Sequence, residues 1–220
     1  MRVHVVVPEF MANSDGRDPS RFAFAANEEA LQRAAGRLRE GGFDAEVLED
    51  AEAARTRMAT LVPPGASVFT GTSETLRISG IEADLNASGR YEAIKPRIQT
   101  MDRKTQAGEI RKLIASPDIA VGSAAAVTET GSIVAASSTG FQIPAYAGGA
   151  GRVILVIGAQ KVVPDLNIAM ERMKSYVLPL EDARALATYG VNSVMNRVLV
   201  FNGEPFGRVT VLLLREVIGY

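Results

Sequence analysis

The sequence predicts an α/β fold with a mainly parallel sheet that helices cover on both faces. Short β-branched runs alternate with segments whose apolar residues recur at helical spacing. Near the C-terminus, the apolar runs 194–201 and 209–214 are separated by NGEPFG, and Asn202-Gly203 is typical of a hairpin turn. We therefore expect a C-terminal antiparallel hairpin that extends or flanks the parallel sheet.

The first third of the chain is predicted to hold two helices and three strands. Residues 3–7 form a β-branched run, and a polar loop follows over 13–21. Asn27 is placed to cap a helix, with Gly41 and Gly42 at its end. The apolar stripe of this helix consists of Leu31, Ala34, Ala35 and Leu38.

A strand, a helix and a second strand follow at short intervals. Residues 44–48 are predicted to form a strand, and Asp50 to cap a helix that ends before Pro63. The strand 68–70 then runs through Gly71 into a short helix.

The rest of the chain continues the alternation. Asp102 is expected to cap a helix with Ala107, Ile110 and Ile114 inward, whose basic residues are solvated. Two helical segments are expected over 166–177 and 178–190. Further apolar strands are predicted at 119–122, 133–136 and 153–157.

Composition narrows the classes of function. The 220 residues suit one domain over 1–220 with a sizeable core, and 24 basic residues nearly balance 25 acidic ones. This balance gives no electrostatic footprint for nucleic acid or an anionic membrane. No run approaches the roughly 20 apolar residues that span a bilayer, so we expect a cytoplasmic protein without a membrane span.

The sequence contains no cysteine and a single histidine. Without cysteine, the sequence offers no thiolate for an iron–sulfur cluster, a zinc site or a disulfide. The single histidine, His4, alternates with valines and is interpreted as a structural strand residue. We expect no metal site and no cofactor bound by this chain, so that any chemistry depends on carboxylate, hydroxyl, lysine, tyrosine or backbone amide groups.

Glu129 is the candidate catalytic residue. It stands between two apolar runs, beside Thr130 and Gly131, where a strand end is expected to meet a turn. A solvated turn carboxylate is the competing interpretation, because most acidic residues in loops face solvent.

A hydroxyl-rich loop follows the predicted strand 68–70. Gly71, Thr72, Ser73 and Thr75 combine a flexible glycine with short donors, a pattern that can hold an anion such as phosphate or carboxylate. The loop lacks the P-loop lysine and the GxGxxG pattern, so a simple helix cap is an equal alternative. We expect this loop and Glu129 to meet, because both would open at carboxyl ends of strands.

Three further residues complete the candidate set. Lys161 comes three residues after the end of the apolar strand VILVIG and can reach over the sheet edge to an anion, although most such lysines are solvated. Gln142 is added to the predicted anion-binding residues. Tyr146 is either a hydroxyl donor or an aromatic residue packed on the core.

Most of the chain resembles the LUD-domain lactate-utilisation family, in its LutC/YkgG branch. The ETG core at Glu129, then QIPAYA, QKVVPDL and PLED, occur in the order of that family, with GTSETL upstream. The resemblance covers roughly residues 60–220 and is weaker over 1–60.

The resemblance implies a three-layer α/β/α fold, similar to the sugar-phosphate isomerase and CoA-transferase superfamily (NagB/RpiA/CoA-transferase-like). It also implies a subunit of a bacterial complex that oxidises L-lactate to pyruvate together with iron–sulfur subunits. The absence of cysteine agrees with clusters held by those partners. Whether the chain also forms a homo-oligomer is left open.

Two hypotheses follow. In the first, the chain is a subunit that is not redox-active alone, with the Gly71 loop, the Glu129 turn and Lys161 forming one anion pocket. In the second, it is a stand-alone enzyme acting on a sugar phosphate or CoA ester, with Glu129 as base or nucleophile.

Overall fold

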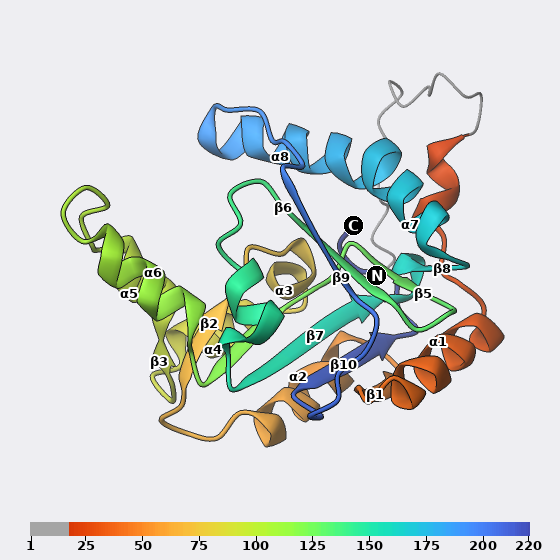
Figure 1. The fold of residues 1–220 in the computed structure, drawn as a ribbon, viewed down its shortest axis with the longest axis horizontal. Coiled ribbons are helices and arrows are strands. Elements are labelled where there is room, and N and C mark those ends of the chain that lie inside the picture. Colours follow the sequence, from red (N-terminus) through yellow and green to blue (C-terminus); the bar gives the residue numbers. More distant parts are fainter. Residues whose placement is uncertain (1–17) are drawn as a thin grey trace.

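Two sheets organise the computed structural model, which describes residues 18–220 (Figure 1). The central sheet has six parallel strands in the order β1-β10-β7-β4-β2-β3. Their bounds are β1 Asp44–Leu48, β10 Val209–Leu214, β7 Arg152–Gly158, β4 Ile119–Gly122, β2 Ser67–Thr70 and β3 Glu92–Ala93. The predicted mainly parallel sheet is confirmed, whereas the predicted strand 3–7 and His4 lie outside the described residues.

The second sheet is smaller and was not predicted. It has the order β8-β5-β6-β9, and only its β5–β8 pair is parallel. The strands are β8 Val162–Val163, β5 Ala126–Thr128, β6 Ile133–Ser137 and β9 Arg197–Phe201. Two and three residues are too few to show a period of two in the sequence, which is why β8 and β5 escaped prediction.

Helices cover one face of the central sheet. The side chains that alternate along the strands, such as Ile154 and Val156 of β7, pack there against Met58, Leu76 and Leu85. These three residues belong to α2 Ala51–Leu61, α3 Glu74–Ile78 and α4 Ile81–Ala87.

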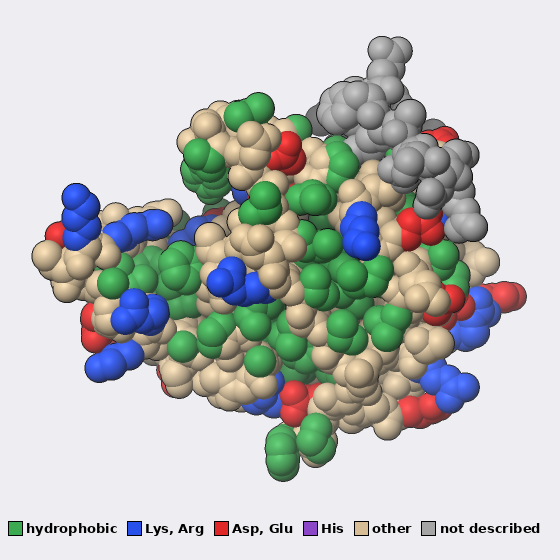
Figure 2. All heavy atoms as spheres, turned by 45° about the horizontal axis from the view of Figure 1, so that its top comes forward, with side chains coloured by type: hydrophobic (Ala, Val, Ile, Leu, Met, Phe, Trp, Pro, Cys, Tyr) green, Lys and Arg blue, Asp and Glu red, His purple; other side chains and the backbone are tan. Residues whose placement is uncertain are grey.

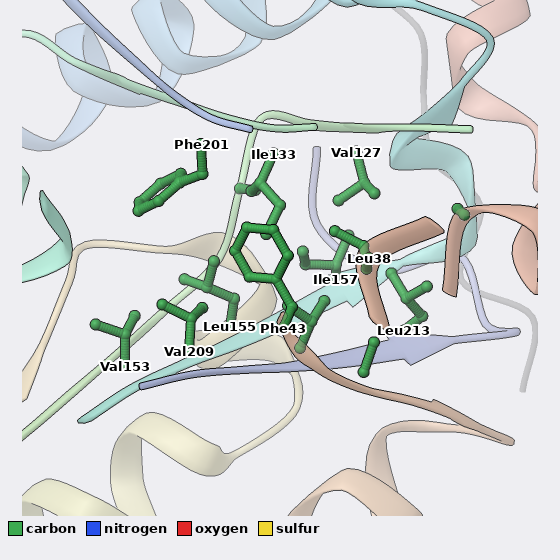
Figure 3. Close-up of a cluster of buried hydrophobic side chains, with 14 of the residues drawn as sticks. Leu38, Phe43, Val127, Ile133, Val153, Leu155, Ile157, Phe201, Val209 and Leu213 are labelled. Atoms are coloured by element: carbon green, nitrogen blue, oxygen red, sulfur yellow. The ribbon is translucent and has the colours of Figure 1, made fainter. Parts of the chain in front are cut away.

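The opposite face of the central sheet packs against both a helix and the second sheet. Figure 3 shows Val153, Leu155 and Ile157 facing Ile133 and Phe201 of the second sheet across a shared apolar core. Helix α1, Glu28–Glu40, closes this core with Leu38 and its other apolar residues. The layer on this side is therefore mixed, rather than built from helices alone.

Three helical segments cover the outer face of the second sheet. They are α7 Leu166–Arg172, η4 Met173–Val177 and α8 Leu178–Tyr189, and Met173 and Tyr176 pack there against Val134. Two more helices, α5 Ile94–Gln99 and α6 Ala107–Ala115, pack on Phe69 near the β3 edge. They form the lobe at the left of Figure 1, apart from α8. The described residues also include the short helical segments η1 Pro19–Ala23, η2 Ala145–Gly149 and η3 Ala159–Lys161.

Helix α1 shows how local sequence sets the element bounds. The Asn27 side chain accepts the Ala30 N–H at 2.9 Å, as an N-cap does, and two glutamates occupy the first turn. At the other end Gly42 has φ 88°, and a Cβ there would lie 2.4 Å from the Glu204 carbonyl oxygen. Both the left-handed backbone and the close approach require glycine, so the predicted stop is confirmed.

Two predictions about pairing and capping are corrected. Antiparallel pairing is present near the C-terminus, but β9 pairs with β6, while β10 lies between β1 and β7. The predicted hairpin does not form because residues 202–208 carry the chain from one sheet to the other. Asp102 caps a separate turn, accepting the Lys104 N–H at 2.9 Å, and α6 begins after Gln106 without a side-chain cap.

Within residues 18–220, no helix is both long and apolar enough to cross a bilayer.

Candidate functional site

The main candidate site is a cavity of about 650 Å³ at the carboxyl ends of three central strands. Gly71, Thr72 and Ser73 reach it from the end of β2, Ser123 from the end of β4, and Lys161 from the end of β7. This edge is where ligands usually bind in open α/β sheets. Three of the predicted loop residues and Lys161 are thus brought together.

Lys161 is the only charged cavity residue that is almost fully buried in the described chain, at 2% exposure. Its ammonium group donates to Thr75 Oγ1 at 2.8 Å and to Ser123 Oγ at 3.0 Å. Thr75 in turn donates to the Ile218 carbonyl oxygen at 3.4 Å. Thr75 therefore supports Lys161 from behind, although it does not line the cavity itself.

A second buried cation, Arg172, lies behind the inner end of the cavity. It is fully buried and donates through Nε to the Gln160 carbonyl oxygen at 3.2 Å, while its Nη2 has no hydrogen-bond partner among residues 18–220. Burial, followed by repulsion from Arg172, holds the pKa of Lys161 well below its usual value of 10.5. Burial also lowers the pKa of Arg172 to about 10.

No carboxylate offsets this positive charge within residues 18–220. The carboxylates that line the cavity, Glu74 and Glu181, are each paired with an arginine at 2.6–2.7 Å. Since a buried cation without a counter-charge is costly, an anion bound beside Lys161 would be stabilised.

Tyr146 presses its hydroxyl group against two glycines of the strand ends. A Cβ on Gly122 would lie 1.6 Å from Tyr146 Oη, and one on Gly71 would lie 3.1 Å from it. The ring is buried, and burial raises the pKa of Tyr146. The interpretation of Tyr146 as an aromatic residue packed on the core is confirmed, and the residue also lines the cavity.

Gln142 also lines the cavity, but its amide is engaged with β6. Its Nε2 donates to the Ala136 carbonyl oxygen at 3.2 Å, and Ser137 Oγ donates to its Oε1 at 3.0 Å. These bonds fix the amide at the wall.

Glu129, Thr130 and Gly131 lie outside this cavity, in the turn between β5 and β6. Glu129 pairs with Arg33 of α1, with 2.7 Å between Arg33 Nε and Glu129 Oε2. A Cβ on Gly131, whose φ is 93°, would lie 2.9 Å from the Arg37 carbonyl oxygen. The turn is packed on α1, so the predicted meeting of Glu129 with the Gly71 loop is not found.

Sequence reasoning missed Ser123 and Arg172. Ser123 carries no motif of its own, and only the fold brings it to Lys161. Arg172 lies three residues after Ala169 on the inward face of α7, and a basic residue at an inward helical position is a signal that could have identified it.

No group of three or more His, Cys, Asp or Glu side chains that could hold a metal ion occurs in the described part of the chain.

Replacing Glu129 by glutamine is expected to change the free energy of unfolding by less than about 1 kcal/mol, because the partner Arg33 is 54% exposed. The backbone bond from Glu129 N–H to the Val163 carbonyl oxygen, 2.8 Å, does not depend on the side chain. Urea unfolding measures this, with Glu40→Gln as a matched exposed ion-pair control. A larger loss in Glu129→Gln alone would show that the carboxylate holds the turn together.

A comparison with protein families matches the sequence to one of them. The sequence model of the LUD domain matches residues 31–194, a range that includes the cavity loops and Lys161. Among solved structures, a crystal structure of a DUF162 family protein from Deinococcus radiodurans is similar, with 13% identity and a TM-score of 0.48. That alignment covers 84% of this chain and 96% of the other. No curated protein matches the sequence.

Proposed function

The chain belongs to the LUD domain family, which is associated with lactate utilisation, and on that premise we propose that it is a subunit of a bacterial L-lactate-oxidising complex. In this proposal it is a cytoplasmic member of the LutC/YkgG branch and does not carry redox clusters. The iron–sulfur clusters are held by partner subunits, because this sequence contains no cysteine to ligate them.

The observation that carries the proposal is buried Lys161 at the inner end of the cavity. A 2-hydroxy or 2-oxo acid has one carboxylate, and an ammonium group already oriented by Thr75 and Ser123 suits it as a partner. Binding would place the negative charge beside Lys161, with Arg172 behind it, where no described carboxylate competes.

The remaining groups orient the acid rather than react with it. Ser123 lines the cavity and can offer a hydroxyl group to the bound acid, and so can Tyr146. Oxidation of L-lactate removes two electrons and two protons, and the electrons pass to the partner subunits. The chain's contribution is to bind and position the substrate or product.

The alternative, a stand-alone enzyme for a sugar phosphate or CoA ester, relied on Glu129 as base or nucleophile. An ion pair with exposed Arg33, outside the cavity, gives that role no support.

Affinity purification of the full chain from cells grown on L-lactate tests the proposal, with lactate oxidation assayed on the eluate and on the isolated chain. We expect cysteine-rich subunits to co-purify and activity to appear only in the complex. A lone chain without partners, or a lone chain that oxidises lactate, would contradict it. Cells grown on glucose serve as the control for induced partners.

A further inference from the structure

The cavity is much larger than a 2-hydroxy acid. L-lactate has six non-hydrogen atoms and occupies roughly 100 Å³, the share of three or four water molecules in the liquid. The cavity measures about 650 Å³, which lies within the range of about 300–1,000 Å³ for sites of larger organic ligands. Lactate bound at Lys161 would therefore leave most of the cavity empty. The cavity has room for a larger ligand, or for a second ligand beside lactate.

The free part of the cavity has apolar walls. Ile98 and Ile110 contribute from α5 and α6, and Met173 and Val177 from the opposite side. Four large apolar side chains that line it are exposed by 43–61%, namely Phe141, Tyr189, Val191 and Val194. Exposed apolar side chains scattered singly over a surface are ordinary, but a group of them around one cavity indicates a surface that a ligand covers.

The side of the cavity formed by α6 carries two cations without acidic partners. Arg103, just before α6, and Arg111, within it, are exposed, and no ion pair to either occurs among residues 18–220. Their neighbours differ, because Lys95 is paired with Glu82 and Arg97 with Glu109. Figure 2 shows Lys and Arg side chains gathered on this lobe, with hydrophobic side chains between it and the rest of the molecule.

From this arrangement we infer that the cavity binds a phosphate-bearing aromatic molecule of mononucleotide size. The aromatic body packs between the apolar walls, and the phosphate group lies against Arg103 and Arg111, which match its geometry through bidentate hydrogen bonds. The inner end with Lys161 stays available for a carboxylate or a polar ring edge. The inference extends the proposed function at the same cavity, but it depends on the walls and the outer arginines rather than on lactate.

The test uses flavin mononucleotide and riboflavin, a fluorescent pair that differs only in the phosphate group, with adenosine monophosphate as a second probe. We expect the full chain to bind flavin mononucleotide at least about tenfold more tightly than riboflavin, since two charge-assisted contacts are added. Added salt should weaken the binding of flavin mononucleotide and leave that of riboflavin nearly unchanged.

A charge-reversal pair supplies the matched control. Arg103→Glu combined with Arg111→Glu should remove the preference for the phosphate-bearing probe. Lys104→Glu combined with Lys112→Glu changes the net charge equally at adjacent exposed positions that do not line the cavity, and should retain it. Val194→Asp should weaken the binding of both flavins, because it reduces the apolar area of the cavity wall.

The inference falls if no phosphate-bearing aromatic probe binds, if the two flavins bind equally, or if both charge reversals act alike. Pyruvate titrated into the same preparations separates this failure from that of the proposed function. If the protein binds pyruvate in a manner that depends on Lys161 but does not bind the nucleotides, the inference is overturned and the proposed function is not.

Discussion

Replacing Lys161 by methionine is expected to reduce the affinity for pyruvate and L-lactate by roughly 30-fold or more. Removing one partner of a buried, hydrogen-bonded charge pair typically costs about 2–5 kcal/mol. Isothermal titration of the purified chain measures the loss. Lys95→Met is the control, because Lys95 also lines the cavity but is already paired with Glu82.

The fold is expected to survive this change. Thr75 keeps its bond to the Ile218 carbonyl oxygen, and methionine fills a similar volume without a charge to desolvate. At pH values near or above the lowered pKa of Lys161, wild-type binding of an acid should also take up a proton, because a carboxylate raises that pKa. Titrations in buffers of different ionisation enthalpy should detect this uptake in the wild type and not in Lys161→Met. Equal affinity in both proteins would remove Lys161 from the site.

The free energy of unfolding should depend on pH through the ionisation of Lys161. Between the lowered pKa of folded Lys161 and its usual value of 10.5, the unfolded chain binds a proton that the folded chain lacks. The free energy of unfolding contributed by this group therefore rises with pH across that window, and Lys161→Met should lose this rise.

Replacing Gly122 by alanine is expected to lower the free energy of unfolding by about 3 kcal/mol or more. The new Cβ would lie 1.6 Å from Tyr146 Oη and 2.8 Å from Cζ, so the buried ring must leave its place. For a chain of this size the melting temperature should fall by roughly 6–12 °C. Thermal unfolding followed by circular dichroism measures the change.

Two variants make this result interpretable. Gly36→Ala, on α1 with nothing within 4 Å of the new Cβ, should be neutral or stabilise by about 0.5–1 kcal/mol. Tyr146→Phe in the Gly122→Ala background removes the closest atom and should recover part of the loss. A Gly122→Ala protein as stable as the wild type would show that the hydroxyl group does not occupy this position.

Elements with a cap and a sustained period were predictable from the sequence. Helix α1 begins after Asn27 and its apolar stripe is buried as expected, and β1 has the predicted bounds. The Asn-Gly turn led to a wrong pairing because such a turn is a local signal, whereas the partners of β10 in the sheet lie 56 and 166 residues away. Pairing between distant segments is a property of the fold and leaves no local pattern.

The candidate site was predictable in part for the same reason. Residues at the ends of β2 and β7 do meet, because carboxyl ends of parallel strands share one edge of a sheet. Glu129 also follows a strand, yet that strand belongs to the second sheet and its end faces α1. Lys161 was predicted to reach over the sheet edge to an anion, with a solvated lysine as the alternative, and the fold instead buries its side chain at the cavity.

The position of β10 also determines when the central sheet can be completed. β1 has β10 as its neighbour in this sheet, and the side chains of Asp44 and Thr210 meet across 166 residues of chain. At about 5–20 residues per second, a ribosome needs roughly 8–33 s to make that length of chain. During synthesis β1 stays unpaired in the central sheet for this time, whereas the edge of β7 waits only for the roughly 56 residues from Val153 to Val209. Until then both strand edges are open to incorrect pairing.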